Sequence, residues 1–170
     1  NWFSKQYESL LFSIGIVRQK SSLISQKISI AIASAIVNQT ELNTKIKWPN
    51  DILINNKKVG GILIERKKTI FNVGIGINVN IKYNDFPKEL KNNMTSLYVE
   101  KDKQFSREKH LAEIMQSIDY YLKLDTYSTI SKWNTMCAHN NSEIKFHHDN
   151  KLVSGVFLGI NNSGSAIIET

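Results

Sequence analysis

The 170-residue sequence has little of what builds disulfides, thiolate metal sites and membrane spans. Its single cysteine, Cys137, allows neither an internal disulfide nor a cysteine-based metal site, which fits a reducing compartment. Ser, Gln or Lys interrupts every apolar run within a few residues, so no transmembrane helix is expected, and no signal peptide precedes the first predicted element. We therefore expect a cytoplasmic protein with no membrane partner.

Acidic residues are fewer than basic ones, 15 against 22, which gives a formal net charge of +7. A positive charge raises the question of a polyanionic partner such as nucleic acid. The lysines, however, are scattered through turns, with no arginine-rich helix and no interleaved aromatic platform. Ordinary solvated surface is the favoured interpretation, and a non-catalytic basic binding module remains an alternative.

The hydrophobic content of 41% is enough for a buried core, and its periodicity predicts the elements around it. One helix, capped by Ser21 or Ser22, continues to about Ile36, and a second extends over residues 106–123 with Met115 on its core face. Strands are expected at 7–17, 45–48, 52–54, 59–65 and 69–80, with an antiparallel meander in the later part. After Trp133, short strands at 143–148, 152–160 and 165–169 are too few to close a barrel.

The strand at 69–80 alternates between two kinds of side chain. Phe71, Val73, Ile75, Ile77 and Val79 point to one side and are predicted to be core. The opposite side carries glycine and asparagine. Glycine weakens a strand and usually marks close approach of a ligand or of another backbone. The members of this second face are Asn72, Gly74, Gly76, Asn78 and Asn80.

Lys47 stands at the end of a short strand, directly before Trp48 and Pro49. A lysine held there could neutralise a carboxylate or phosphate as negative charge develops, whereas a lysine on a solvated strand face is the alternative. Lys58 precedes a glycine pair, and Asn78 ends the glycine-bearing face, so either could contact phosphates or a metal ion.

Two polar residues follow Pro49. Asn50 and Asp51 are more often turn formers than catalysts, and Asp51 could hold either Lys47 or Lys58 in position. The adjacent His147 and His148 should face opposite sides of a strand, which predicts exposed histidines rather than a metal site.

Three blocks of this chain resemble, in order and spacing, the catalytic core of biotin-protein ligases. They are residues 47–51 (Lys-Trp-Pro-Asn-Asp), 58–65 (Lys-Val-Gly-Gly-Ile-Leu-Ile-Glu) and 74–80 (Gly-Ile-Gly-Ile-Asn-Val-Asn). The segments around Trp2, Thr95 and Trp133 and the closing β segment extend the resemblance over nearly the whole chain.

The resemblance implies an α+β fold. A mixed β-sheet backed by helices, related to class II aminoacyl-tRNA synthetases, would occupy residues 1–140, and an incomplete SH3-like barrel would occupy 141–170. The implied reaction activates biotin with ATP to biotinyl-5'-AMP and transfers biotin to a lysine of the biotin carboxyl carrier protein of acetyl-CoA carboxylase. Lipoate- and octanoate-protein ligases share this fold, and such an acyl transferase remains the alternative.

By the same resemblance, Lys47 would be catalytic and contact the biotin carboxylate and the α-phosphate. Lys58 and Asn78 would serve ATP, with Asn78 also at the magnesium ion. Gly61 and Gly76 would let biotin lie against the backbone.

The remaining implied roles surround these groups. Trp2 would help to shield the adenylate from water, while Asn50 and Asp51 would support the contacting residues. The family's biotin-binding Ser/Thr-Asn segment and its adenylate loop would lie upstream of Trp2, and neither is present in residues 1–170. We therefore expect this stretch alone to activate little or no biotin. It gives no support for DNA binding, and a homodimer through the edge of the catalytic sheet is an open alternative.

Overall fold

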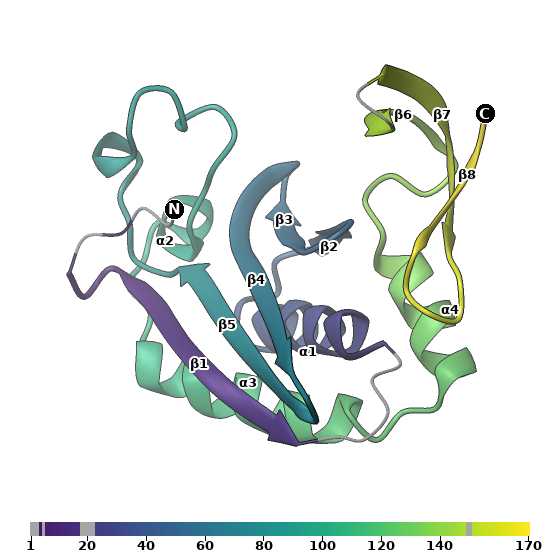
Figure 1. Cartoon of the computed structure of the whole chain (residues 1–170). Helices are drawn as coiled ribbons and strands as arrows, with labels where there is room; N and C mark the ends of the chain where they lie inside the picture. The colour runs from purple at the N-terminus through teal and green to yellow at the C-terminus, as the bar shows by residue number, and fades with distance from the viewer. Residues whose placement is uncertain (1–3, 5, 18–22, 149–150) are drawn as a thin grey trace.

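A computed structural model describes residues 4, 6–17, 23–148 and 151–170. It has a five-stranded sheet and a three-stranded sheet joined through helices (Figure 1). The larger sheet has the strand order β1-β5-β4-β3-β2. Its strands are β1 (Ser9–Val17), β2 (Thr44–Lys47), β3 (Asp51–Ile54), β4 (Lys57–Lys67) and β5 (Ile70–Asn78).

All pairings between strands of the larger sheet are antiparallel, where a mixed sheet was expected. The reason is local, because β3, β4 and β5 follow one another through tight turns, which can join only antiparallel strands. The turn between β3 and β4 uses Asn55 and Asn56, both with positive φ, as a tight hairpin requires. Parallel pairing among the described residues is limited to isolated bridges, such as Ile46 with Cys137.

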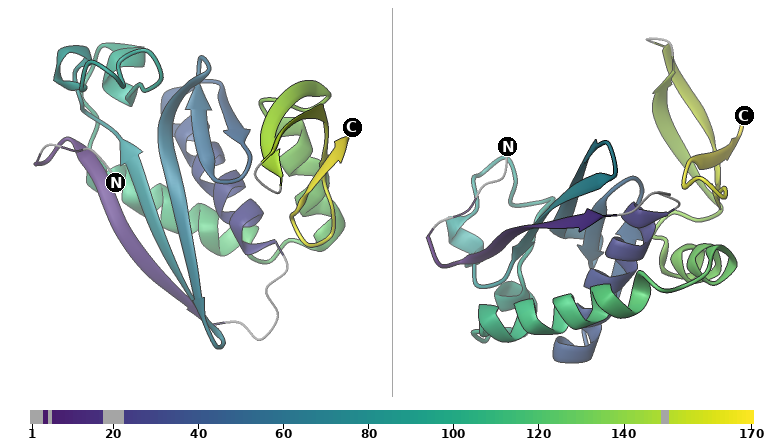
Figure 2. Two further views of the ribbon diagram at one scale, coloured as in Figure 1. Left: turned by 45° about the horizontal axis from the view of Figure 1, so that its top comes forward. Right: turned by 60° about the horizontal axis from the view of Figure 1, so that its bottom comes forward.

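The helices α1 (Ile24–Thr40) and α3 (Arg107–Tyr121) cover one face of this sheet and leave the other face open (Figure 2). Both were predicted. Helix α1 packs against β2, β3, β4 and α3, and most of its side chains are buried. Its N-cap is Leu23 in a left-handed conformation with no side-chain cap, while Ser21 and Ser22 lie outside the described residues. The predicted cap of α3 is confirmed, because Ser106 Oγ accepts the Lys109 backbone N–H at 3.2 Å.

The core lies between the larger sheet and these helices. The predicted core face of β5 is confirmed, with every member at most 5% exposed. One row of directly paired residues crosses all five strands on this side: Leu10, Ile77, Gly60, Ile52 and Ile46. Met115 was wrongly placed in the core. It is 40% exposed, because α3 turns His110, Ile114 and Ile118 inward instead.

The smaller sheet has the order β6-β7-β8 and confirms the three predicted strands. They are β6 (Ser142–His148), β7 (Lys151–Ile160) and β8 (Ala166–Glu169). The side chains of His147 and His148 lie outside the described residues. Two further helices, α2 (Leu97–Lys101) and α4 (Thr126–Met136), and a 3-10 turn at Tyr83–Asp85 were not predicted.

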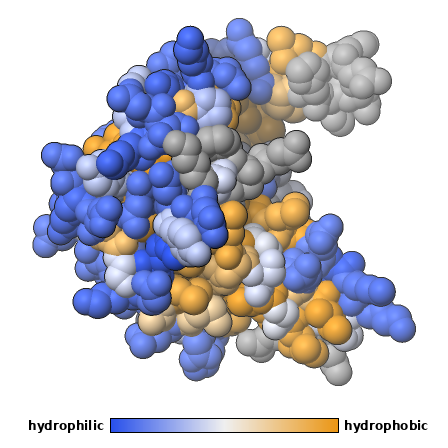
Figure 3. Space-filling model, turned by 90° about the vertical axis from the view of Figure 1, so that its left-hand side faces the viewer, coloured by the Kyte–Doolittle hydropathy of each residue, from blue (hydrophilic) through white to orange (hydrophobic). Residues whose placement is uncertain are grey.

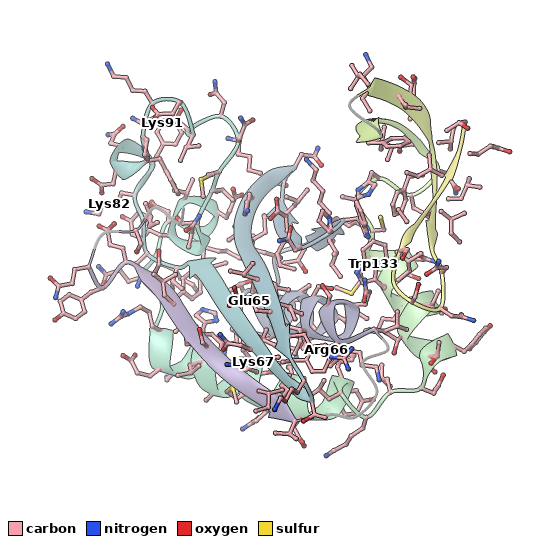
Figure 4. All side chains as sticks on the ribbon, viewed as in Figure 1. Glu65, Arg66, Lys67, Lys82, Lys91 and Trp133 are labelled. Atoms are coloured by element: carbon pink, nitrogen blue, oxygen red, sulfur yellow. The ribbon has the colours of Figure 1, made fainter. Side chains whose placement is uncertain are left out.

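Helix α4 joins the two sheets through Trp133, which is 1% exposed (Figure 4). Its indole N–H donates to Ser29 Oγ of α1 at 3.2 Å, and its ring lies 6.3 Å from the ring of Phe157 in β7. The core of the larger sheet therefore continues into the smaller one. No helix within the described part of the chain is long and apolar enough to cross a membrane.

Burial of His110 makes the stability of this core pH-dependent. The side chain is 2% exposed, and burial lowers its pKa from 6.5 to about 4. A neutral buried histidine stabilises the fold fully above the unfolded-state pKa and loses that contribution as pH falls toward the folded-state pKa. Between about pH 7 and about pH 4 we expect wild type to lose about 3 kcal/mol more unfolding free energy than His110→Gln. Urea titrations across this range measure the difference, and parallel pH profiles for the two proteins would contradict it.

Candidate functional site

The open face of the larger sheet carries a second row of directly paired residues. Leu11 of β1 pairs with Gly76 of β5, Gly76 with Gly61 of β4, Gly61 with Asp51 of β3, and Asp51 with Lys47 of β2. Directly opposite residues of antiparallel strands share a face. Two glycines without side chains thus lie between an apolar residue at one end of the row and a charged pair at the other.

A β-bulge brings Lys58 to this same face. Ile52 pairs with Gly60, but Leu53 pairs with Lys58, so Val59 is an extra residue in β4. Side chains alternate along a regular strand, so Lys58 and Gly61, which are three residues apart, would face opposite sides if β4 had no bulge. The bulge therefore adds a second cation to the open face.

A cleft of about 680 Å³ lies over the glycine row, within the usual range for a small-molecule site. Four of the residues expected at the site line it: Asn50, Lys58, Gly61 and Gly76. Lys47 does not line it and is exposed at the end of the row. The structure adds lining residues that sequence reasoning did not assign to the site. They are Leu11, Phe12, Ser13, Ile62, Leu63 and Ile75, and Gly74 of the predicted glycine face also lines the cleft.

The charged end of the row has two lysines and one carboxylate. Lys58 Nζ lies 2.6 Å from Asp51 Oδ1, so of the two lysines Asp51 holds Lys58. Lys47 is paired with Asp51 across β2 and β3 and faces the same side. One carboxylate against two ammonium groups leaves a net positive charge, which suits an anionic ligand.

Asn50 fixes the loop between β2 and β3 against β4. Its Nδ2 donates to Ile62 O at 2.8 Å, and its own backbone carbonyl accepts the Ile62 N–H at 3.0 Å. The Trp48–Pro49 peptide bond before it is cis. Asn50 therefore both lines the cleft and holds the backbone that follows Lys47.

Asn78 lies at the end of β5 and is fully buried, not on an open surface as its face predicted. The segment before α2 covers it, because Asn78 Nδ2 donates to Thr95 O at 3.0 Å. This bond orients the amide and leaves Oδ1 with no hydrogen-bond partner among the described residues. Thr95 also donates its backbone N–H to Lys58 O at 2.9 Å, so one segment connects both residues expected to serve ATP.

His139 is a further residue near the charged end, and sequence reasoning missed it. Its ring lies 4.4 Å from that of Phe157 in an edge-to-face arrangement. Burial lowers its pKa, and the positive charge of Lys47 lowers it further, so His139 is neutral near pH 7. Burial raises the pKa of the neighbouring Cys137, which disfavours the thiolate. Trp2 lies outside the described residues.

Known proteins resemble this chain in sequence. Residues 1–81 match the model of the biotin/lipoate A/B protein ligase family. The bifunctional ligase/repressor BirA of Bacillus subtilis (strain 168) is 31% identical over 99% of this chain and 56% of its own length. The chain thus spans about half of this curated relative.

Solved structures resemble it in fold. The biotin protein ligase from Aquifex aeolicus in complex with biotin and ATP superposes with a TM-score of 0.87 at 29% identity, over 99% of this chain and 74% of that one. The biotin protein ligase from Leishmania major in complex with biotinyl-5-AMP, at 18% identity and a TM-score of 0.69, shares the fold. The chain therefore resembles the biotin/lipoate A/B protein ligase family over residues 1–81 and has the fold of a biotin protein ligase.

Proposed function

We propose that the protein to which this chain belongs is a biotin-protein ligase. It activates biotin with ATP to biotinyl-5'-AMP and then transfers biotin to one lysine of the biotin carboxyl carrier protein of acetyl-CoA carboxylase. The observation that carries this proposal is the row from Leu11 through Gly76 and Gly61 to Asp51 and Lys47. Such a row offers a bare backbone floor for a flat ring and a cation for its carboxylate.

The apolar end of the row would bind the ring system. Leu11 and Leu63, which are 52% and 63% exposed, border the glycine backbone on the open face. A ring laid on Gly61 and Gly76 would cover this apolar surface, at about 25 cal/mol per Å² removed from water. Hydrophobic surface also gathers on the β1 side of the molecule (Figure 3).

The charged end would act on the reacting atoms. In the first step a biotin carboxylate oxygen forms a bond to the α-phosphorus of ATP, and pyrophosphate leaves with the electrons of the broken P–O bond. Lys47 would neutralise the charge that develops on the α-phosphate oxygens. In the second step the neutral amine of the carrier lysine attacks the acyl carbon and AMP leaves, and the same ammonium would stabilise the oxyanion.

Magnesium would enter this site with the nucleotide. Within the part of the chain that the structure describes, no group of three or more His, Cys, Asp or Glu could hold a metal ion. Magnesium commonly takes few protein ligands and completes its shell with water and phosphate oxygens. The buried Asn78 Oδ1, which has no hydrogen-bond partner among the described residues, fits such a role. Bound magnesium would neutralise phosphate charge, while Lys58 would hold the phosphates in place.

Lipoate or octanoate transfer is the second candidate, because the matching family model includes lipoate enzymes as well as biotin enzymes. A basic binding module without catalysis is the third, from the net charge of +7. The full-length protein, incubated with labelled biotin or labelled lipoate and Mg-ATP, separates the three. A biotin ligase accumulates biotinyl-adenylate and ignores lipoate. Adenylation of lipoate alone, or of neither acid, would overturn the proposal.

We also propose a division of the chain into two units. Residues 1–140 would form the catalytic unit and 141–170 part of an SH3-like barrel. A homodimer would form through the exposed edge of the larger sheet, and the cytoplasmic location rests on composition.

A further inference from the structure

We infer that the turn between β7 and β8, residues 161–165, positions the loop at residues 48–50, which directly follows Lys47. This inference rests on the proposed function and assigns a role to a part of the chain outside the cleft. Two side chains from distant parts of the sequence converge on one backbone oxygen of the turn. Gly164 O accepts the indole N–H of Trp48 at 3.3 Å and the amide N–H of Gln26 at 3.2 Å.

The turn is preorganised to present this oxygen. Asn161 Oδ1 accepts hydrogen bonds from the backbone N–H of Ser163 at 2.9 Å and of Ser165 at 3.0 Å. The Gly164 N–H donates to Asn161 O at 2.9 Å. The conformation of the turn is therefore set by its own side chain and backbone bonds before any contact with the larger sheet.

Glycine is required at position 164 for two reasons. Its φ of +83° lies in the left-handed region, which favours glycine. A Cβ there would also lie 2.6 Å from Gln26 Nε2, and Gln26 is only 6% exposed. The turn thus approaches the Gln26 side chain of α1 more closely than any other residue would allow.

The loop needs this support because of its place in the sheet. Strand β2 is at the edge of the larger sheet, where the Ala138 N–H donates to Ile46 O at 2.8 Å, and no strand among the described residues flanks Lys47 itself. Beyond Pro49, Asn50 is fixed to Ile62 by two hydrogen bonds. The bond from Trp48 to Gly164 fixes the near end, directly after Lys47. The loop is therefore held to β4 on one side and to the smaller sheet on the other.

The surroundings of Trp48 leave room for movement if that bond is lost. A cavity of about 310 Å³ lies at this junction and is lined by Trp48, Pro49, Phe71 and Gly164, among others. A freed indole could turn into this space, and the backbone of Lys47 would follow. Misplacement of a catalytic group by about 1 Å can cost about 100-fold in rate, so this hydrogen bond would govern catalysis more than binding.

Trp48→Phe in the full-length protein tests the inference, because it removes the indole N–H and keeps an aromatic ring. We expect kcat for adenylate formation to fall about 10-fold, with KM for biotin changed less than about twofold. Trp133→Phe is the matched control, since it removes an indole hydrogen bond of 3.2 Å to Ser29 Oγ, away from the loop. It should lower stability and leave kcat within about twofold of wild type.

Hydrogen–deuterium exchange of residues 44–54 gives a readout that does not depend on activity. Exchange in this segment should rise in Trp48→Phe and stay at the wild-type level in Trp133→Phe. A wild-type protein that activates no biotin would refute the proposed function, while the exchange data would still test the role of the turn. Unchanged kcat and unchanged exchange in Trp48→Phe would overturn the inference. Equal losses of kcat in both variants would do the same, because they would indicate general destabilisation.

Discussion

Lys47→Gln in the full-length protein is expected to slow biotinyl-adenylate formation by about 100-fold or more. The Lys47 ammonium stands at the end of a row whose other polar member, Asp51, is already paired with Lys58 at 2.6 Å. Among the described residues, Lys47 forms no ion pair with a carboxylate. Its charge is therefore available to the α-phosphate. Single-turnover measurements with labelled biotin and ATP give the rate, and kcat and kcat/KM should fall together if the charge acts in the transition state.

Lys57→Gln is the matched control for this change. Lys57 pairs with Ile54 in the neighbouring hairpin and does not line the cleft. Its replacement alters the net charge equally and should leave the rate within about twofold of wild type. Equal loss in both variants would show that the net charge matters and not the position of Lys47. Wild-type adenylate formation in Lys47→Gln would refute the assignment.

The pKa of His139 offers an independent check on the position of Lys47. Burial lowers this pKa first, and the Lys47 charge lowers it further. Removal of that charge in Lys47→Gln should therefore raise the His139 pKa, while Lys57→Gln should leave it in place. NMR titration of the histidine ring protons measures both. A His139 pKa that is the same in Lys47→Gln as in wild type would place the ammonium elsewhere.

Local patterns in the sequence were sufficient for the elements around the site. The core face of β5 follows from strict alternation over residues 71–79, and the start of α3 follows from the capping side chain of Ser106. The hairpin turn at Asn55 and Asn56 follows from residue types that accept positive φ. Each of these features is decided by contacts within a few residues, which periodicity and turn chemistry describe well.

Features decided by distant contacts could not be predicted in this way. The bulge at Val59, which turns Lys58 toward the glycine row, depends on the pairing register of β3 with β4. Burial of Asn78 depends on Thr95. The position of the Trp48 side chain depends on a hydrogen bond to Gly164, 116 residues away. Residue types alone indicate single candidates for the site. The row that places these residues side by side depends on the pairing register of all five strands.

Gly74→Val is expected to raise KM for biotin by about 10- to 100-fold without weakening the fold. Gly74 lines the cleft in the row next to Gly76, paired with Ser13 on one side and Leu63 on the other. A Cβ at this position would meet Leu63 O at 3.7 Å and Ser13 Oγ at 3.8 Å, which are ordinary contacts. The new side chain would therefore fit the sheet and stand in the space where the ring is proposed to lie.

The stability of Gly74→Val distinguishes a blocked biotin-binding surface from a damaged fold. A β-branched residue suits a strand better than glycine does, so the unfolding free energy of Gly74→Val should be equal to or higher than that of wild type. Gly15→Val is the matched control, because Gly15 lies on the same face of β1 outside the cleft and a Cβ there meets nothing within 4 Å. Titration of biotin at saturating Mg-ATP should show the rise in KM for Gly74→Val alone. Equal KM values in the two variants would mean that biotin does not lie on this part of the sheet.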